Sequence, residues 1–506
     1  MMQRVDAVLD RLTMYRATVY YLVAALLVAV GLSAFHVLPY HPLDIVLSTV
    51  FLLAVSWFVN TLFSRFLHVH SVPESVVITA LILALIIEPS QPMHHLALLG
   101  WAAVWAMGAK YLLAVRKKHF VNPAAFGVVV TSLVLGQSAS WWVGAPAMLP
   151  VVLVGGLLLV RKLGRADLLW AFFMTVAIAT FGFVVLRSMD LVTTASQLVL
   201  RSPLLFFGFV MLTEPSTMAP THRTRLAYGA LVGLLFTPYF HLGSYYFAPE
   251  VALLVGNLFT YAVSYRARVV LRLDAKDQIG PDTLSFRFKA DRRVQFRPGQ
   301  YLECTLPHEP ADSRGHRRYF TIASAPTEPG LELGVKFYPE SSSFKSTLAR
   351  MREDDQMFAC QLAGDFTLPR DHDQKLAFVA GGIGITPFRS ILKYLADTGD
   401  RRPVVLIYCV KSAADIVYRD VIDEARRRLG IRVAYVVFDG NLPPGAEAVA
   451  GVLTPETLRA LVPDYRERLF YLSGPQGMVR AYEGLLGGAG VKANRIKTDY
   501  FPGFAA

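Results

Sequence analysis

The distribution of apolar residues along the chain constrains the fold more than any other feature of the sequence. From Ala17 to Tyr265 one apolar run follows another with only short polar loops between them, whereas after Arg266 a charged residue appears every few positions. Charged residues make up 17% of the chain, while soluble globular proteins contain about 25%. The mean hydropathy is +0.41. The sequence therefore predicts a polytopic α-helical membrane domain over residues 1–266, followed by a soluble half.

The predicted membrane domain divides into ten apolar segments, some shorter than the roughly 20 residues of a straight span. They cover about residues 17–35, 43–64, 75–87, 96–115, 123–136, 143–160, 168–186, 202–213, 226–239 and 248–265. Segments three, five, eight and nine are the short ones. Short segments at matching places in two halves are typical of broken helices around a site at the membrane midplane.

The tripeptide Glu-Pro-Ser ends two of these segments. It closes the third segment at Glu88 and the eighth at Glu214. An offset of five segments reverses the orientation of the second copy, so we expect an inverted repeat. Glu88 and Glu214 are then membrane-site candidates for contact with a proton, an ion or a cofactor. The alternative is that Glu-Pro acts only as a helix stop.

The basic residues of the loops indicate the orientation of this domain. If the N-terminus is cytoplasmic and the segments alternate in direction, twelve Lys or Arg residues lie on the inner side and only Arg187 and Arg201 on the outer side. This asymmetry follows the positive-inside rule. It favours a multi-pass protein of the cell (inner) membrane, surrounded by membrane lipid and with its soluble half in the cytoplasm. It disfavours nucleic acid as a partner.

The cysteine and histidine residues give no pattern for a metal site. Cys304, Cys360 and Cys409 are too few to supply the four ligands of an iron–sulfur cluster. A haem within a membrane needs paired histidines inside apolar helices. The histidines of the first half lie at segment ends or in loops. We therefore expect no metal.

Two stretches of the first half resemble a known membrane family. "KHFVNPAAFGVVV" and "FFGFVMLTEPSTMAPTHRTRLAYG" are similar to the RnfD/NqrB family, the membrane subunits of Rnf and Na⁺-translocating NADH:quinone reductase complexes, over about residues 70–265. The resemblance implies ten helices in an inverted repeat and FMN esterified to a Thr in a Ser-Gly-Ala-Thr motif. That motif is absent: the loop is shortened to "GQSASWW", and Thr193 and Thr194 are a poor substitute. We expect neither covalent FMN nor ion pumping, and a second, non-covalent flavin in this domain stays open.

The second half of the chain changes to a strand pattern. Six alternating stretches with Gly and Pro turns predict a small closed antiparallel β-barrel over residues 267–372. From Lys375 strands and helices alternate, which predicts a parallel, doubly wound α/β domain over residues 373–506. The expected fold class is therefore multidomain, with a polytopic helical membrane domain, an antiparallel β-barrel and a doubly wound α/β domain.

The stretch "RYFTIASAP" carries the strongest signal of the second half. It resembles the Arg-x-Tyr-Ser/Thr signature of the ferredoxin–NADP⁺ reductase superfamily, and the likeness covers about residues 268–506. The resemblance implies an oxidoreductase whose barrel binds FAD and whose α/β domain binds NAD(P)H. Arg318 would neutralise the FAD pyrophosphate, Phe320 would lie against the isoalloxazine ring, and Thr321 would bond near flavin N5. Tyr319 belongs to the same candidate set.

Four further candidates for cofactor binding follow this strand. Lys336 and Tyr338 end the next predicted strand, and Ser342 and Ser343 open a predicted helix. The hydroxyls and N-terminal amides of such a helix suit a pyrophosphate, and in the resembled family a Ser near this place binds flavin phosphate. Simple N-capping by serine is the alternative, and both can hold at once.

Two glycine-containing turns mark the predicted nucleotide site. "VAGGIGITP" lies between a predicted strand and a helix, and its glycines permit a tight turn with phosphate at the helix start. "SGPQGM" follows the last but one strand, where the resembled superfamily has a Cys in place of Ser473, near the meeting point of nicotinamide and flavin. The candidates are Gly381, Gly382, Gly384, Thr386, Ser473, Gly474, Pro475 and Met478.

The C-terminus and one inner turn complete the candidate site. Asp499 and Phe501 resemble the terminal acid-x-aromatic of the superfamily, in which the aromatic ring covers the flavin and the acid lies near the reacting edge; the alternative is a strand packed in the core. Lys411 and Ser412 would meet the adenine ribose and suit a 2′-phosphate, whereas the nearby Asp415 leaves NADH equally open.

These patterns together predict a membrane-bound oxidoreductase that takes a hydride from NAD(P)H onto FAD. Its catalytic candidates are Thr321, Ser473, Asp499 and Phe501. The acceptor would be a quinone, a second flavin or a redox partner protein at or in the membrane. The alternative is a transporter or binding unit that the fused reductase gates or serves.

Overall fold

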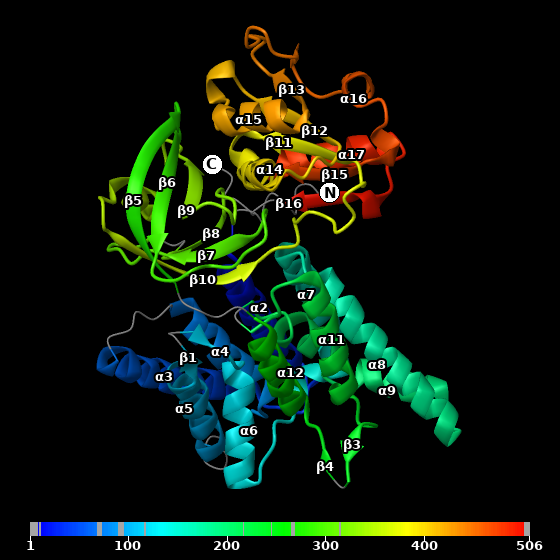
Figure 1. The fold of residues 1–506 in the computed structure, drawn as a ribbon. Helices are drawn as coiled ribbons and strands as arrows, with labels where there is room; N and C mark the ends of the chain where they lie inside the picture. Colours follow the sequence, from blue (N-terminus) through cyan, green and yellow to red (C-terminus); the bar gives the residue numbers. More distant parts are fainter. Residues whose placement is uncertain are drawn as a thin grey trace. The chain divides into compact units, whose positions relative to one another are not determined.

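The computed structural model describes residue 9 and residues 12–67, 73–89, 96–115, 118–215, 217–243, 245–264, 269–312 and 315–499. The chain forms two compact units, Met1–Ser264 and Tyr265–Ala506. The first unit is mainly helical, with short strand pairs β1-β2 and β3-β4, and the second contains two six-stranded sheets with covering helices (Figure 1).

In the described part of the first unit, each of the ten predicted apolar segments overlaps a helix. Helix α9 was not predicted from the sequence. The helices are α2 (Met14–Ala34), α3 (Pro42–Phe66), α4 (Pro73–Ile86), α5 (Leu96–Leu112), α6 (Pro123–Leu135), α7 (Leu149–Leu163), α8 (Ala166–Arg187), α9 (Leu191–Leu200), α10 (Leu204–Phe206) with its π-helical continuation η3 (Phe207–Met211), α11 (His222–Phe236) and α12 (Pro249–Val263).

Four helices of the described chain are long and apolar enough to cross a membrane. They are Met14–Ala34, Pro42–Phe66, Pro146–Leu163 and Ala166–Arg187. The pair Leu191–Leu200 and Leu204–Met211 passes the same criterion together but is bent by 57°. A helix rises about 1.5 Å per residue and a hydrocarbon core is about 30 Å thick, so a straight span needs about 20 residues. The other apolar helices, including α5 and α12, are shorter than this.

Proline and capping residues explain where the shorter helices begin and end. Pro42, Pro73, Pro123 and Pro249 stand at the first positions of α3, α4, α6 and α12, where a missing amide hydrogen is tolerated. Asn122 caps α6 by accepting a hydrogen bond from the amide of Ala125 at 3.0 Å. Local sequence, more than apolar length, therefore sets the helix bounds in this unit.

The second unit begins with a six-stranded antiparallel sheet. Its spatial order is β8-β7-β10-β5-β6-β9. Beyond the end of β8, the amide of Ala323 donates to the carbonyl of Glu332 on β9 at 2.8 Å, which brings the two edges of the sheet together. The strands are β5 (Val269–Gly280), β6 (Thr283–Ala290), β7 (Tyr301–Thr305), β8 (Arg317–Thr321), β9 (Leu331–Lys336) and β10 (Gln356–Ala363), and helix α13 (Ser343–Arg350) follows β9.

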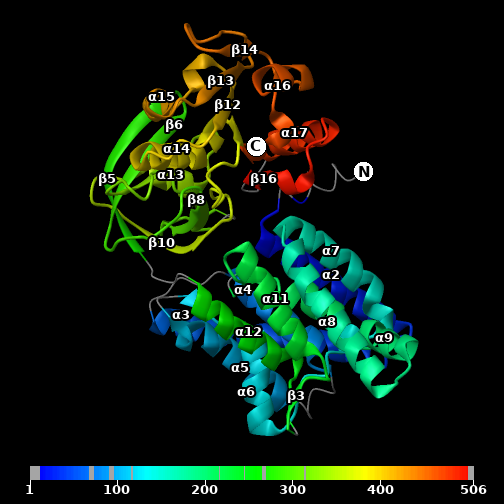
Figure 2. The same ribbon diagram turned by 45° about the vertical axis from the view of Figure 1, so that its right-hand side comes forward.

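The rest of the second unit is a parallel sheet between two helical layers (Figure 2). Its order is β14-β13-β12-β11-β15-β16. Phe378 of β11 packs into the core beneath α14 and α15, whereas its neighbour Val379 packs into the core beneath α16 and α17. The elements are β11 (Leu376–Gly381), α14 (Thr386–Thr398), β12 (Val404–Val410), α15 (Arg419–Leu429), β13 (Arg432–Val437), β14 (Ala448–Ala450), α16 (Pro455–Leu461), β15 (Leu469–Ser473), α17 (Gln476–Gly488) and β16 (Ile496–Asp499). The structure confirms the predicted antiparallel and doubly wound parallel sheets.

Candidate active site

Two turns meet at the carboxyl ends of β11 and β15, where the strand order of the parallel sheet reverses. Such a switch point is where open α/β sheets bind ligands. A Cβ atom on Gly384 would lie 2.6 Å from the Cα atom of Gly474, and one on Gly381 would lie 2.5 Å from Cε of Met478. The two glycine-containing turns therefore pack directly on each other, and both predicted nucleotide motifs lie at one place.

Gly382 supplies an open, anion-compatible surface at this switch point. Its φ is +52°, a left-handed conformation that favours glycine, and no heavy atom lies within 4 Å of the position of a Cβ atom. The turn leads into α14, where Thr386 donates to the carbonyl of Ile383 at 3.2 Å. An open backbone before a helix N-terminus fits the close approach of a nucleotide phosphate.

Three of the predicted catalytic residues come together although they lie far apart in the sequence. Ser473 and Asp499 are opposite each other in the β15–β16 pairing. The Thr321 side chain, at the end of β8, lies beside the Asp499 carboxylate. Burial raises the pKa of Asp499 from 3.8 to about 7, against a smaller opposing contribution from Thr321. A carboxyl group that titrates near neutrality can hold or release a proton at this place. Phe501 lies outside the described residues.

The signature strand β8 presents its side chains on two faces. The Arg318 guanidinium lies 5.3 Å from the ring centroid of Phe344, and Phe320 lies 5.8 Å from the same ring. Tyr319, on the other face, is 37% exposed. Arg318 and Phe320 thus both lie against the ring of Phe344, Phe320 is half-buried, and Tyr319 is the more exposed aromatic residue.

An acidic residue that the sequence did not point out occupies the expected pyrophosphate region. The Asp312 carboxylate accepts a hydrogen bond from the amide of Ser343 at 2.9 Å and lies 3.9 Å from the Arg318 guanidinium. The Ser343 hydroxyl accepts from the Asp312 amide at 2.9 Å, while the Ser342 hydroxyl caps α13 by accepting from Lys345 at 3.3 Å. The Asp312 carboxylate thus engages two of the three predicted phosphate ligands, Arg318 and Ser343. These two donors therefore fit an anion such as a phosphate.

The turn after β12 holds the predicted ribose contacts. Lys411 is exposed, and the Ser412 hydroxyl donates to the Asp415 carboxylate at 3.1 Å. Lys336 of β9 also donates to Asp415, at 3.1 Å. Burial raises the pKa of Asp415, but the hydrogen bonds and charge of Lys336 and the bonds from Ser412 outweigh it, so the pKa lies below its usual value. Tyr338 is 50% exposed beyond β9.

The two Glu-Pro-Ser motifs have different surroundings in the first unit. Glu214 accepts a hydrogen bond from the Asn122 side chain at 2.7 Å, its other oxygen lies 3.5 Å from Nε2 of His119, and it lines a cavity of about 60 Å³. Glu88 is exposed. The serines of both motifs lie outside the described residues. The apolar cavity wall is formed in part by Ile78, Ile82, Leu159, Leu163 and Val210.

Two family models match the chain, and both matches fall on the second unit. The model of the oxidoreductase FAD-binding domain family matches residues 270–361, and that of the oxidoreductase NAD-binding domain family matches residues 378–484. The stachydrine N-demethylase reductase subunit Stc4 of Rhizobium meliloti is 29% identical over 232 residues, 44% of this chain and 65% of that protein. The flavohemoprotein of Deinococcus radiodurans is 27% identical over 211 residues, 41% of this chain and 51% of that protein. The cytochrome P450 reductase GcoB of Amycolatopsis gives a TM-score of 0.42 at 23% identity, over 47% of this chain and 70% of that one.

The domain matches and the reductase relatives define the class of the second unit. It is an NAD(P)H-dependent FAD oxidoreductase unit of the ferredoxin reductase type. The glycine turns, the open backbone at Gly382 and the anion-compatible donors Arg318 and Ser343 fit these cofactors. The chain spans 65% and 51% of the two relatives.

Proposed function

We propose that the whole chain is a membrane-bound flavin oxidoreductase that takes a hydride from NAD(P)H onto FAD and passes the electrons to an acceptor at or in the membrane. The observation that carries the proposal is that a reductase unit shares one chain with a helical unit that has four span-length helices and a mainly apolar cavity lined by Glu214. A plain anchor needs only one span. The cavity supports a helical unit that binds a molecule of its own.

The proposed domains are a membrane domain over residues 1–266, an FAD-binding barrel over 267–372 and an NAD(P)-binding domain over 373–506. The membrane domain would be of the RnfD/NqrB type, with ten segments in an inverted repeat. It would lie in the cell (inner) membrane, with its N-terminus and the reductase half in the cytoplasm. The resemblance around Asn122 and Glu214 and the hydrogen bond between these two residues support this assignment.

The candidate residues of the reductase unit would have two roles, cofactor binding and proton transfer. Arg318, with the start of α13, would hold the FAD phosphates, and the Gly381–Gly384 turn would hold the nicotinamide nucleotide. FAD, when bound, accepts a hydride and gives up its electrons singly or in pairs. Thr321 and Asp499 would then hold or release a proton near the reacting edge, since the pKa of Asp499 is raised to about 7.

The acceptor would be a quinone, a second non-covalent flavin in the helical unit, or a redox partner protein. A half-buried carboxylate with an amide donor and apolar walls offers both polar and apolar contacts to a bound acceptor. The cavity of about 60 Å³ would have to widen to hold a quinone or flavin ring, because ligand pockets measure roughly 300–1,000 Å³. A partner protein is supported by the name of Stc4, which is a reductase subunit. Flavin content distinguishes the second flavin from the other two acceptors.

The test uses the full chain purified in detergent. We expect NAD(P)H-dependent reduction of both ferricyanide and a short-chain quinone, with one FAD released by acid for each chain, or two flavins if the helical unit holds its own. Ferricyanide reduction without reduction of quinone or of a second flavin would leave only a partner protein as acceptor. Absence of ferricyanide reduction by FAD-loaded protein would contradict the proposal.

A second candidate is a transporter or binding unit that the reductase gates or serves. The polar cluster of Glu214, Asn122 and His119 favours it, because membrane-depth carboxylates often mark ion or substrate paths. In proteoliposomes this candidate predicts NAD(P)H-dependent ion flux that persists without any membrane electron acceptor. The leading proposal predicts quinone reduction without such flux.

A further inference from the structure

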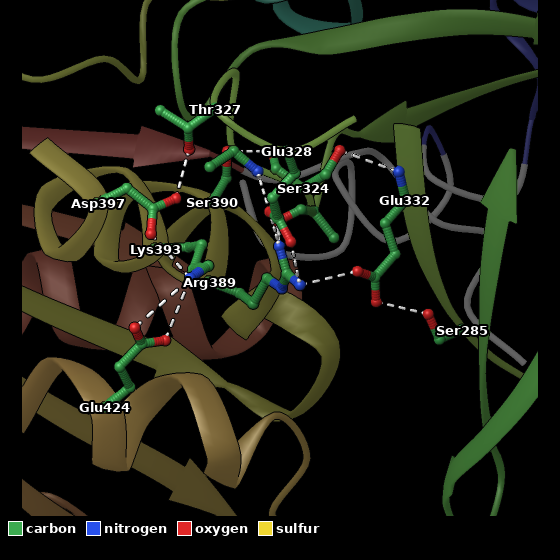
Figure 3. Close-up of polar contacts among 12 residues, drawn as sticks. Ser285, Ser324, Thr327, Glu328, Glu332, Arg389, Ser390, Lys393, Asp397 and Glu424 are labelled. Atoms are coloured by element: carbon green, nitrogen blue, oxygen red, sulfur yellow. Dashed lines mark hydrogen bonds and ion pairs between the residues drawn. The ribbon is translucent and has the colours of Figure 1, made fainter. Parts of the chain in front are cut away.

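A buried cluster of charged residues joins the flavin barrel to the nucleotide-binding sheet (Figure 3). Its centre is Arg389, one turn into α14 and directly after the glycine-rich turn. The Arg389 guanidinium is paired with Glu328 and lies 2.9 Å from Glu332, both from the barrel side. The side chain of Arg389 is 9% exposed and that of Glu332 is 10% exposed. The contact therefore crosses the boundary between the two cofactor domains and is largely shielded from water.

The barrel side of this cluster is held in a fixed geometry. Ser285 of β6 donates to Glu332 at 2.5 Å, and the amide of Ala325 donates to Glu328 at 2.5 Å. A neighbouring contact runs the same way, because the Ser390 hydroxyl donates to the carbonyl of Ser324 at 2.7 Å. Both carboxylates thus have partners within the barrel. Both oxygens of Glu328 accept from the Arg389 guanidinium. Glu332 presents to this guanidinium the oxygen that Ser285 does not bind, an arrangement that the planar fork of arginine suits.

Strand β9 packs closely against side chains of the nucleotide-binding domain beside this cluster. A Cβ atom on Gly334 of β9 would lie 2.6 Å from the Tyr418 hydroxyl and 2.8 Å from Cγ2 of Thr386. Tyr418 itself has φ of +57°, and its ring centroid lies 5.7 Å from the Arg389 guanidinium carbon. A non-glycine residue is held in the left-handed region only where its surroundings fix it. Strand β9 is therefore seated directly on the turn that begins α14.

Stability alone is a weak reason for such a cluster. Taking an arginine and two carboxylates out of water has a desolvation cost that their mutual attraction offsets only in good geometry, and apolar residues of similar volume serve stability as well. A buried ionic cluster instead enforces one arrangement of the parts that it joins. Here those parts are the barrel that binds FAD and the helix whose start holds the nicotinamide nucleotide.

We propose that Arg389 is a positioning residue for hydride transfer, acting through Glu328 and Glu332 to fix the nucleotide turn against strand β9 of the flavin barrel. The inference rests on hydride transfer within the reductase unit and is independent of the acceptor proposed for the helical unit. Displacement of about 1 Å between reacting groups can cost about 100-fold in rate. Weakening the ion pairs of Arg389 with Glu328 and Glu332 should therefore slow flavin reduction without removing either cofactor.

The experiment compares the two half-reactions in the full-length flavoprotein. Arg389→Lys keeps the charge but loses the planar fork, and the triple variant Arg389→Met, Glu328→Gln, Glu332→Gln removes the charges together and so avoids an unpaired buried ion. Lys393→Met is the matched control, one turn further along α14, where the lysine pairs with Asp397 and Glu424 and is 22% exposed. Stopped-flow absorbance follows flavin reduction by NAD(P)H, the charge-transfer band between nicotinamide and flavin, and reoxidation by ferricyanide.

We expect flavin reduction to slow by about 10- to 100-fold in the Arg389→Lys variant and in the triple variant, with a weaker charge-transfer band. Flavin content and ferricyanide reoxidation should be unchanged, and the Lys393 variant should match the unmodified protein. Equal loss of both half-reactions, or loss of bound flavin, would show a structural role and overturn the proposal. Flavin reduction at the normal rate in the Arg389→Lys variant would overturn it as well.

Discussion

The two units of this chain differ in how closely their sequence motifs come together in the fold. In the reductase unit, Gly384, Ser473, Thr321 and Asp499 come from distant parts of the sequence and meet at one switch point. In the helical unit, the repeated Glu-Pro-Ser tripeptide leads to one carboxylate at a cavity and one that is exposed. A glycine at a backbone crossing tolerates no substitute, whereas a helix stop is tolerated in many surroundings. A sequence motif therefore predicts a site more reliably when close backbone contacts require its residues.

The largest expected effect is that of a methyl group at the crossing of the two turns. Gly384→Ala would place a Cβ atom against the backbone of Ser473 and 2.6 Å from Gly474 Cα, so one turn must move. We expect NAD(P)H-dependent ferricyanide reduction to fall by about 100-fold, while bound FAD stays. Gly477→Ala is the control, because nothing lies within 4 Å of its Cβ position. Equal rates in the two variants would break the comparison.

The second prediction asks whether the two Glu-Pro-Ser motifs are equivalent. Glu214→Gln should lower reduction of the membrane acceptor about tenfold, since a carboxylate bonded to Asn122 lines the cavity. Glu88→Gln should leave the rate within about twofold, because an exposed carboxylate remains solvated. Both variants should reduce ferricyanide normally. Equal losses of acceptor reduction would indicate matched sites and restore the symmetry predicted from the sequence.

The third prediction concerns pH. Burial raises the pKa of Asp499 to about 7 from 3.8, so the folded chain binds this proton more tightly than the unfolded chain. The stabilising contribution is complete below pH 3.8 and is lost as the pH rises through about 7. Ionised Asp499 would also oppose charge accumulation on a reduced flavin. We expect flavin reduction to slow above pH 7, and Asp499→Asn to flatten this profile.

The melting temperature gives an independent check on the same group. Asp499→Asn should melt at least about 3 °C above the unmodified protein at pH 8.5, and the difference should shrink as the pH falls towards 3.8. A variant that melts lower at pH 8.5, or a wild-type profile without a step near pH 7, would contradict the assignment of this carboxyl group.

The smallest expected effect tests the acidic residue at the phosphate donors. Asp312→Asn removes a negative charge 3.9 Å from Arg318. FAD should then bind about threefold more tightly at low salt, and the difference should shrink at high salt because exposed charges are screened. Fluorescence titration of the apoprotein measures both constants, and Asp291→Asn, a change at a distant barrel loop, serves as control. Weaker FAD binding would show that Asp312 supports the site.

Sequence periodicity predicted much of the fold. The six barrel strands and the parallel sheet follow from alternation and glycine turns, and the helices follow from apolar runs. Helix lengths were predicted less well. Helix α12 has only 15 residues, because it begins at Pro249 and ends at Val263, before the polar stretch that starts at Ser264. Helix α9 was missed since its Thr, Ser and Gln residues interrupt the apolar pattern.

The sequence pointed to candidate residues where one backbone motif implies one role, as at Gly382, Thr321 and Asp499. The structure places Thr321 and Asp499 together and Gly382 at the switch point, and their roles stay predictions. Asp312 and Arg389 were not predicted, because nothing in their local sequence shows that a loop and a helix will meet partners elsewhere in the unit. Tertiary contacts of this kind have no short-range signal, and only the folded arrangement reveals them.

Single-turnover kinetics of the full chain in lipid nanodiscs that contain quinone tests the central claim most directly. After anaerobic mixing with one equivalent of NAD(P)H, flavin absorbance and quinone absorbance are followed together. The account predicts that the flavin bleaches first and then recovers in step with quinone reduction, with a slower recovery in the Glu214→Gln variant. A flavin that stays reduced in the presence of quinone until ferricyanide is added, with no second flavin taking up its electrons, would contradict an acceptor in the helical unit.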